Sequence, residues 1–535
     1  MKGPFLSSHS GKSGGDKKQQ IRDRAVEPHM KAFEDMKIDP DLKATLKLIE
    51  EEMGGSNDVI VKEITLIGEI PFQAAVLYIQ GLVDDNRLNE HVLEPVQRAR
   101  LTAPAVNADE TLNQINKSLL QVGDVEAVDN WAKVFQSLFV GNTILFVDGL
   151  NKAISAGTIG GPKRDVTEPQ TNMVIRGPRE GFTESIRTNS ALLRRKIRSP
   201  KLWLDQRTIG SVTQTPVGIM YVKGIADDSL IEELSIRLDA ISIDGVLESG
   251  YIEELISDQK ITPFPTIFYN ERPDVIAAGL LEGRIAILVD GTPFVLMAPA
   301  TFNVFFQAAE DYYQRYDIST FLRMLRFLSF AMALMLPSVY VAIVGYHQEM
   351  IPTPLLLKLA AQREGVPFPA YVEAFMMEII FEVLREAVVR MPIAVGNTIS
   401  IVGGLVIGQS VVEAGFFSPA VVIIVSLTAI TSFVSPAYNL AIAARLLRFG
   451  LLIAAASLGF YGIALIVLAL LLHLTSLRTL GVPYLKPFAP LFWKDMKDSI
   501  IRVPFWMMKQ RPQGAAPKNK VRESTDINKS KGGDS

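Results

Sequence analysis

The sequence predicts an α/β soluble N-terminal region, built as two similar subdomains, followed by an all-α polytopic membrane domain. Three observations support this fold class. Charged residues make up 21% of the chain, but they are dense before residue 327 and scarce between residues 327 and 474. That second stretch holds four long apolar windows, and the first 300 residues contain a repeated pattern. The two regions therefore match two different solvents.

The apolar windows set the membrane prediction. They cover residues 327–346, 393–412, 414–444 and 450–474. A helix needs roughly 20 apolar residues to cross about 30 Å of hydrocarbon, and each window is long enough. Pro436 interrupts the third window and is expected to divide it into a crossing and a second segment that ends at Arg445 and Arg448. We expect four to six crossings, with an even number favoured.

Composition and charge restrict the remaining possibilities. The net charge of -3 argues against a nucleic-acid partner. The absence of cysteine excludes disulfides, thiolate catalysis and cysteine-based metal sites. No apolar segment like that of a signal peptide opens the chain, and basic residues such as Arg323, Arg326 and Lys494 flank the apolar region. We therefore expect both termini on the cytoplasmic side.

These patterns divide the chain into six expected parts. They are a disordered arm (1–34), a first α/β subdomain (35–165), a basic linker and helix (166–204), a second α/β subdomain (205–310), the transmembrane domain (311–480) and a cytoplasmic tail (481–535), disordered after about residue 512.

A repeat in the N-terminal region predicts the two similar subdomains. The run from Tyr78 to Asp85 resembles the run from Tyr221 to Asp228, at an offset of 143 residues (221 − 78). The runs 141–149 and 283–291, each ending in Asp-Gly, match at an offset of 142 residues (283 − 141). Two matches in the same order at nearly the same offset indicate an internal duplication.

The repeated acids have a structural interpretation. The pairs Asp84/Asp85 and Asp227/Asp228 stand where helix N-caps are expected. Asp290-Gly291 lies between two apolar runs and is typical of a hairpin turn. Metal binding by the paired acids is the alternative, but no histidine or further acid joins them in sequence, so we expect capping and turn formation and no metal.

A basic segment lies between the two halves of the repeat. Its basic residues are Arg176, Arg179, Arg187, Arg194, Arg195, Lys196 and Arg198. The segment is a candidate interface with anionic lipid, formed by Arg176, Arg179, Arg194, Arg195, Lys196 and Arg198. The alternative is an exposed linker and helix whose charges are solvated or paired with Glu180 and Glu184.

Residues 369–390 read as a helix with one charged side. At 100° per residue, one stripe carries Glu378, Glu382, Arg385 and Glu386, whereas Glu373 breaks the pattern. A charge at the centre of a bilayer costs roughly 3 kcal/mol, so the stripe must face water, protein or lipid headgroups. The helix either lies at the membrane interface or lines a polar cavity or pore. Three acids among four charges would favour cations.

The apolar window after this helix is rich in glycine. Gly403, Gly404 and Gly408 are candidate helix-packing positions, because glycine lets helices approach closely. The packing is expected either within one subunit or between identical subunits.

Several longer runs resemble one known family. The run "IRGPREGFTESIRTNSALLRRKIRSPKLW" (175–203) is similar to the hallmark of the A subunits of bacterial spore germinant receptors, the GerA family. Further similar runs are "DGTPFVLMAPATFNVFFQAAEDYYQRY", "REGVPFPAYVEAFMMEIIFEVLREA", "ISIVGGLVIGQSVVEAG" and "GVPYLKPFAPL". The resemblance covers about residues 170–510 strongly and 35–170 more loosely.

The resemblance implies a membrane subunit of a nutrient sensor in the inner membrane of the dormant spore. Such a subunit works with a transporter-like B subunit and a lipoprotein C subunit, and we also expect a homo-oligomer without cofactors. The leading hypothesis is a non-enzymatic subunit that triggers germination and forms or gates an ion path. A secondary transporter is the alternative, but it predicts inverted repeats in the membrane half, and the repeat lies in the soluble half. An enzyme is the third class, but the five histidines are scattered.

Overall fold

A computed structural model describes residues 30–68, 72–98, 100–101, 124–160, 169, 174–391, 408–515 and 517–522. Its chain divides into two compact units. We call the first the sheet unit; it comprises Met1–Ser257, Tyr269–Pro299 and Val503–Ser535. The second, the helical unit, comprises Asp258–Phe268 and Ala300–Arg502. Most of the expected N-terminal arm, together with Gly403 and Gly404, lies outside the described residues.

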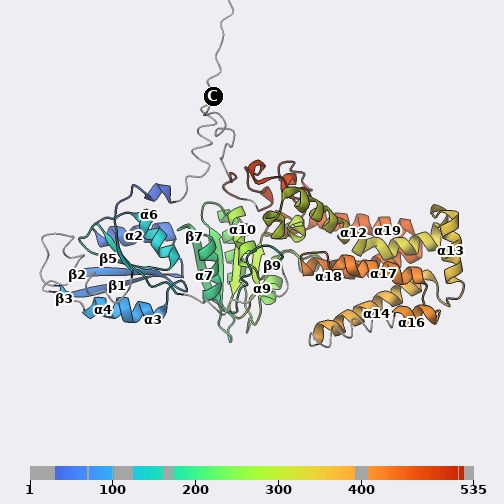
Figure 1. Ribbon diagram of the computed structural model, residues 1–535, viewed down its shortest axis with the longest axis horizontal. Coiled ribbons are helices and arrows are strands. Elements are labelled where there is room, and N and C mark those ends of the chain that lie inside the picture. The colour runs from blue at the N-terminus through green and yellow to red at the C-terminus, as the bar shows by residue number, and fades with distance from the viewer. Residues whose placement is uncertain are drawn as a thin grey trace, which may run out of the picture. The chain divides into compact units, whose positions relative to one another are not determined.

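The sheet unit begins with a six-stranded subdomain. Its elements are α2 (Leu42–Met53), β1 (Val59–Gly68), β2 (Phe72–Ile79), α3 (Asp85–Leu88), a π-helical turn (Asn89–Leu93), α4 (Glu94–Arg98), β3 (Arg100–Leu101), β4 (Val125–Val128), α6 (Trp131–Val140), β5 (Thr143–Val147) and β6 (Ala153–Ala156) (Figure 1). The strand order is β3-β1-β2-β5-β6-β4. β1 pairs antiparallel with β2, and β5 pairs antiparallel with both β2 and β6.

The second subdomain repeats this arrangement. Its elements are α7 (Ile186–Lys196), β7 (Leu202–Ile209), β8 (Thr215–Val222), α8 (Asp228–Asp239), α9 (Ser249–Ile256), β9 (Phe268–Asn270), α10 (Pro273–Glu282), β10 (Ile285–Val289) and β11 (Val295–Ala298). The strand order is β7-β8-β10-β11-β9. Without the edge strand β3, the first sheet has the same order in the same chain sequence, β1-β2-β5-β6-β4. The predicted pair of similar subdomains is therefore confirmed.

Alternation along the central strand β2 explains why its middle residues, Ala74–Leu77, are all apolar and buried. Ala75 and Leu77 belong to a core cluster that includes Trp131 and Phe135 of α6. Their neighbour Val76 belongs to a different cluster, on the side of α3 and α4. Successive side chains of a strand point to opposite faces, so a central strand covered on both faces has no polar side.

The predicted helix caps are present in both subdomains. The Asp84 carboxylate accepts a hydrogen bond from the Asn86 amide at 3.0 Å, at the start of α3. The Asp227 carboxylate accepts one from the Ser229 amide at 3.0 Å, at the start of α8. Each carboxylate satisfies an amide that would otherwise lack an intrahelical partner.

The two Asp-Gly turns have a matching second contact. Asp290 follows β10 in the predicted hairpin, and its carboxylate accepts a hydrogen bond from the Ile186 amide at 2.9 Å, at the first residue of α7. Asp148 follows β5, and its carboxylate accepts one from the Leu42 amide at 3.1 Å, at the first residue of α2. In each subdomain, the turn therefore fixes the start of the first helix.

The helical unit contains the expected apolar region. Its helices are α11 (Glu310–Tyr313), α12 (Tyr316–Tyr346), α13 (Thr353–Arg363), α14 (Ala370–Arg390), α16 (Gly408–Glu413), α17 (Pro419–Ser432), α18 (Tyr438–Leu458) and α19 (Phe460–Ser476), with 3-10 turns at Phe302–Phe306, Gln348–Met350 and Asp495–Asp498, and a short ladder of β12 (Arg478–Thr479) and β13 (Val482–Pro483). Among the described helices, α12 and α18 are long and apolar enough to cross a membrane, and α17 and α19 are shorter apolar helices.

The helix boundaries differ from the prediction after Pro436, and the predicted window 450–474 covers the end of α18 and most of α19 rather than one helix. The chain breaks near Pro436, as predicted, but the segment after it does not end at Arg445 and Arg448. α18 runs through both arginines to Leu458, and Gly459, with φ of 60°, separates it from α19. Both arginines have acidic partners inside the helical unit, so they need not mark the edge of a span.

We predict that Asp290→Ala lowers the stability of the sheet unit by about 1–2 kcal/mol, because the Ile186 amide loses a charged acceptor at a helix start. Asp148→Ala should have a similar effect through the Leu42 amide. Thermal unfolding of the purified full chain measures both. The control is Glu232→Ala, an exposed position on α8. Wild-type stability of Asp290→Ala would refute the structural assignment of the turn.

Candidate functional site

The charged stripe of α14 faces other helices of its own chain. Glu378 is fully buried, and its carboxylate lies 2.9 Å from a guanidinium nitrogen of Arg448 on α18. Glu382 accepts a hydrogen bond from Arg445 at 3.0 Å and lies 3.7 Å from Arg448. A buried carboxylate requires such partners, because several kcal/mol would otherwise be lost by desolvation. These two acids therefore join α14 to α18.

Arg385 extends the cluster to α17. Its guanidinium donates a hydrogen bond to the Ser432 hydroxyl at 2.8 Å and lies over the Phe433 ring, 4.5 Å from the ring centroid. It is also 3.9 Å from Glu382, three residues earlier on the same helix, where side chains are neighbours. Arginine is suited to this position because its flat group can stack and hydrogen-bond at once. We call Glu378, Glu382, Arg385, Arg445 and Arg448 the five-charge cluster.

Glu386, the fourth predicted residue, lies outside this cluster. It pairs with Arg390 at 2.5 Å, and both side chains are exposed. Such an exposed pair contributes little to stability. The stripe therefore divides into three residues that face the neighbouring helices and one that faces outward.

The cluster changes the predicted charge balance. The stripe alone carries three acids and one base. The five-charge cluster instead combines two carboxylates with three guanidinium groups, because α18 contributes Arg445 and Arg448. The acidic excess of the stripe is therefore offset by arginines from α18. Arg445 and Arg448 lie three residues apart in an apolar stretch, which indicates that they need acidic partners. No local pattern identifies those partners as the acids of α14.

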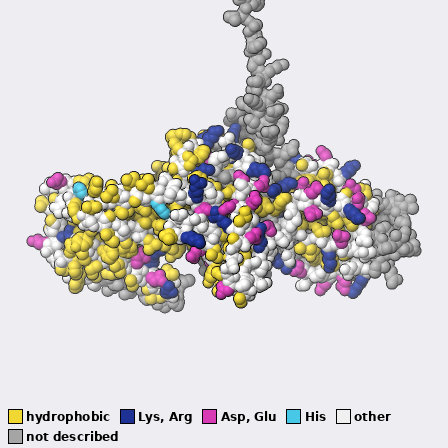
Figure 2. Space-filling view, turned by 180° about the vertical axis from the view of Figure 1, so that it is seen from behind, with side chains coloured by type: hydrophobic (Ala, Val, Ile, Leu, Met, Phe, Trp, Pro, Cys, Tyr) yellow, Lys and Arg dark blue, Asp and Glu magenta, His cyan; other side chains and the backbone are white. Residues whose placement is uncertain are grey.

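The opposite face of α14 is apolar and exposed. Met376, Ile379 and Val383 all stand among the exposed hydrophobic side chains. A helix of a soluble protein shows the reverse arrangement, with its apolar stripe inward. Figure 2 shows hydrophobic side chains gathered on the surface of the helical unit. A helix with charges inward and apolar groups outward fits a hydrocarbon environment.

A cavity of about 500 Å³ lies beside the cluster, between α14 and α18. Its lining is apolar and includes Tyr371, Phe375, Leu452 and Ile453. None of the four predicted stripe residues lines it.

Glu373, which breaks the stripe, has a separate role. It is fully buried and accepts hydrogen bonds from the Ser418 amide at 2.9 Å and the Ser418 hydroxyl at 2.8 Å. Ser418 directly precedes α17, so the carboxylate stands at the positive end of that helix dipole. Arg363 lies 3.3 Å from the same carboxylate.

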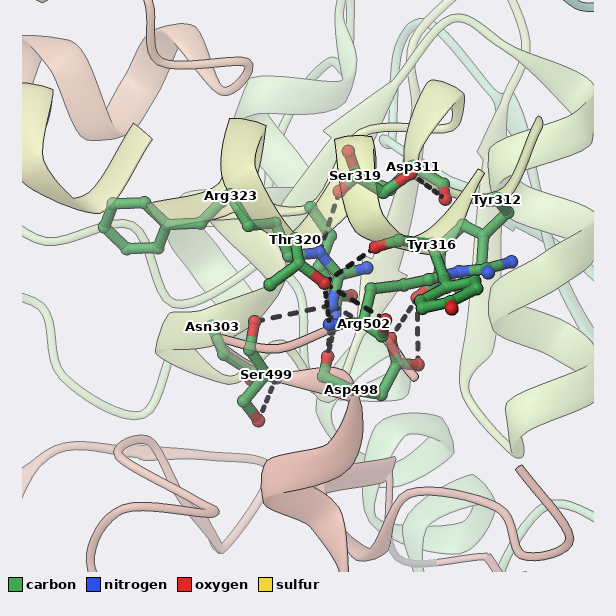
Figure 3. Close-up of polar contacts among 12 residues, drawn as sticks. Asn303, Asp311, Tyr312, Tyr316, Ser319, Thr320, Arg323, Asp498, Ser499 and Arg502 are labelled. Carbon is green, nitrogen blue, oxygen red and sulfur yellow. Dashed lines mark hydrogen bonds and ion pairs between the residues drawn. The ribbon is translucent and has the colours of Figure 1, made fainter. Parts of the chain in front are cut away.

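A second buried network joins the start of α12 to the segment after α19 (Figure 3). Asp311 is buried and accepts hydrogen bonds from Arg323 and Arg326, each at 2.8 Å. Arg323 also donates to Asp498 at 2.9 Å, and the Tyr312 hydroxyl donates to the same carboxylate at 3.0 Å. From the sequence, Arg323 and Arg326 are predicted only as charges that flank a membrane span, because Asp498 lies 175 residues from Arg323.

The candidate basic interface divides into buried and exposed residues. Arg194 is fully buried in the sheet unit, where it lies 2.5 Å from Asp58 and donates to the Ser56 hydroxyl at 2.9 Å. It therefore joins the two subdomains. Because it is buried, it is not part of a surface that could contact lipid. Lys196 lies 3.2 Å from Glu180, as the alternative proposed. The exposed members of the set are Arg176, Arg179 and Arg198, and Arg195 is half-buried.

No group of three His, Cys, Asp or Glu side chains is placed to hold a metal ion within the described part of the chain.

Comparison with known proteins identifies relatives along most of the chain. The family profile described as "Bacillus/Clostridium GerA spore germination protein" matches residues 47–514. Spore germination protein KA of Bacillus subtilis (strain 168) is 49% identical over 489 residues, which cover 91% of this chain and 89% of that protein. The uncharacterized membrane protein YfkQ of the same organism is 43% identical over 493 residues, covering 92% and 95%.

A solved structure is also similar. The crystal structure of the N-terminal domain of the A subunit of the Bacillus megaterium spore germinant receptor GerK3 is 39% identical, with a TM-score of 0.39. The match covers 50% of this chain and 97% of that one.

We predict that Arg448→Met destabilises the helical unit by about 3–5 kcal/mol, because Glu378 is left charged and buried without its partner. The double variant Glu378→Gln with Arg448→Met should recover part of this loss. Arg390→Met, in the exposed pair with Glu386, is the matched control and should change stability by about 0.5 kcal/mol or less. Thermal unfolding of the full chain in detergent reports all three. Equal effects of Arg448→Met and Arg390→Met would contradict the assignment.

We predict a similar loss, about 3–5 kcal/mol, for Arg194→Met in the sheet unit, since Asp58 would remain buried without its charged partner. Arg198→Met removes an exposed arginine two residues beyond the end of α7 and serves as the control. Limited proteolysis of the full chain should cut the Arg194→Met variant faster between the two subdomains. Unchanged cleavage there would show that this pair does not hold the subdomains together.

Proposed function

The chain belongs to the Bacillus/Clostridium GerA spore germination protein family, and from that premise we propose that it is an A-type membrane subunit of a nutrient germinant receptor that triggers spore germination. The observation that carries the membrane assignment is α14, where Glu378, Glu382 and Arg385 face protein and the apolar side chains face outward. The two long apolar helices α12 and α18 support it.

The proposal includes a location and partners. We place the subunit in the inner membrane of the spore, with both termini on the cytoplasmic side. Its proposed partners are a transporter-like B subunit, a lipoprotein C subunit and further copies of this chain. Gly408 lies at the start of α16, and with Gly403 and Gly404 it is proposed to allow close helix packing between copies.

We further propose that the five-charge cluster holds an ion path closed. In the described arrangement, Glu378 and Glu382 are neutralised by Arg445 and Arg448. Separation of α14 from α18 would release the carboxylates from these arginines and leave charged groups that require water. Water and ions would then follow the charged face of α14. In this proposal, activation replaces the arginine partners of Glu378 and Glu382 with water.

Cysteine accessibility tests the ion path. The chain has no native cysteine, so single cysteines at positions 378 and 382 can be labelled selectively with a water-soluble thiol reagent. We expect protection in dormant spores and labelling after addition of nutrient. A cysteine at position 386, which is exposed, should label in both states.

Cation release from spores provides the functional measurement. Glu378→Gln with Glu382→Gln should remove most of the nutrient-triggered release, whereas Glu386→Gln should leave it near wild type. Immunodetection of the subunit in spore membranes separates lost conduction from lost assembly. Unchanged release in the double variant, with equal protection of positions 378 and 382 in both states, would reject the path.

A further inference from the structure

The first α/β subdomain contains a segment that the second cannot form from neighbouring residues. After β6, residues 157–160 cross the turn at the end of β2. There the Gly160 amide donates to the Leu82 carbonyl at 2.9 Å, and the Asp84 amide donates to the Thr158 carbonyl at 2.9 Å. In the second subdomain, the chain enters the helical unit at Ala300, directly after β11. The residues that follow β11 therefore cannot cover the equivalent turn, at Ile225, as residues 157–160 cover the turn at Leu82.

The C-terminal segment fills that position. The Lys518 amide donates to the Ile225 carbonyl at 2.8 Å, and Ile225 is the repeat equivalent of Leu82 at the offset of 143 residues (225 − 82). The Gly160–Leu82 hydrogen bond of the first subdomain is thus reproduced by a residue nearly 300 positions from its partner.

Two equivalent glycines confirm the correspondence in space. A Cβ atom added at Gly141 would lie 2.7 Å from the Leu82 carbonyl oxygen and 3.6 Å from Ile159 Cα. A Cβ atom added at Gly283, its equivalent, would lie 3.2 Å from the Ile225 carbonyl oxygen and 3.0 Å from Pro517 Cβ. Pro517 and Lys518 therefore occupy the place of residues 159 and 160.

Arg511 anchors the same segment at a helix end. It is mostly buried, and its Nε donates to the Leu281 carbonyl at 2.7 Å, in the last turn of α10. Carbonyls in this turn lack intrahelical donors, and a cation there also interacts favourably with the helix dipole. The Arg511 amide donates to the Lys520 carbonyl at 2.9 Å, so the segment closes on itself.

A charge pair adds side-chain complementarity. Lys518 Nζ lies 2.5 Å from an Asp228 carboxylate oxygen at the first residue of α8. In the first subdomain, Arg187 of α7 lies 2.8 Å from the equivalent Asp85. Each repeat therefore offers an acid beside the turn, and each is met by a base from another part of the chain.

We propose that Ile225, Asp228, Leu281 and Gly283 form a docking surface for an extended peptide segment, and that its occupant is residues 509–522 of the same chain. The docked segment completes the second subdomain. It also fixes the chain after α19 to the subdomain from which the chain enters α12. The sequence predicted disorder after about residue 512, whereas the structure describes the backbone through Ala515 and from Pro517 to Arg522. This inference is independent of the proposed ion path.

Carbodiimide crosslinking of the wild-type full chain tests the occupant. The reagent joins a lysine amine to a carboxylate in contact with it, so we expect a crosslinked peptide pair containing Lys518 and Asp228. Lys520 is exposed on the same segment and should not crosslink to Asp228. A mixture of isotopically heavy and light chains shows whether the crosslinked Lys518 and Asp228 belong to one chain or to two copies. Pairs within one mass label support the proposal, whereas mixed pairs or no Lys518–Asp228 product would overturn it.

Hydrogen exchange of a full-length variant and a truncated chain provides the second test. A chain ending at Met508 should exchange its amides at residues 225–226 and 283–284 faster by about tenfold or more, because that turn loses its cover. Lys518→Glu, which faces Asp228 with a like charge, should act in the same direction, and Lys520→Glu should not. A synthetic peptide of residues 509–522 should restore protection to the truncated chain. Unchanged exchange after truncation would refute the docking surface.

Discussion

Removing an ionised group from water costs several kcal/mol, and this constraint governs both units of the protein. In the sheet unit, it is met by Arg194 and Asp58, which join the two subdomains. In the helical unit, it is met by Arg448 and Glu378, which join α18 to α14. Each pair connects elements that are far apart in sequence. Each buried charge therefore favours the arrangement in which its partner lies beside it.

The duplication shows which contacts a subdomain needs. Both copies keep the aspartate that caps the helix after the second strand, and both keep an Asp-Gly turn that binds the first amide of the opening helix. These contacts lie at turns and helix ends, where backbone groups lack partners within an element. The copies differ in the edge strand β3, which only the first sheet has, in the helices after the second strand, and in the chain that follows β6 and β11. The shared contacts thus belong to the architecture of both copies.

Local patterns predicted much of this fold, and long-range partners were beyond them. The offset repeats gave the two subdomains, Asp84 and Asp227 gave the caps, and the 100° periodicity gave the charged stripe of α14. The partners of that stripe could not be predicted, because Arg445 lies 63 residues from Glu382 and nothing local indicates that their helices pack together. The end of α18 was also missed, since an apolar sequence continues on both sides of Gly459. Sequence patterns thus located charges correctly but did not identify their partners.

The contact of Pro517 and Lys518 with the second subdomain has a consequence for synthesis of the chain. A ribosome releases the N-terminal residues first, so the first subdomain can close as soon as residue 160 has emerged. The second subdomain has its last strand by residue 298, but the turn at Ile225 stays uncovered until residues 517 and 518 follow. Throughout translation of the intervening helices, that turn lacks this cover. Its closure then marks a chain whose helical region has been fully translated.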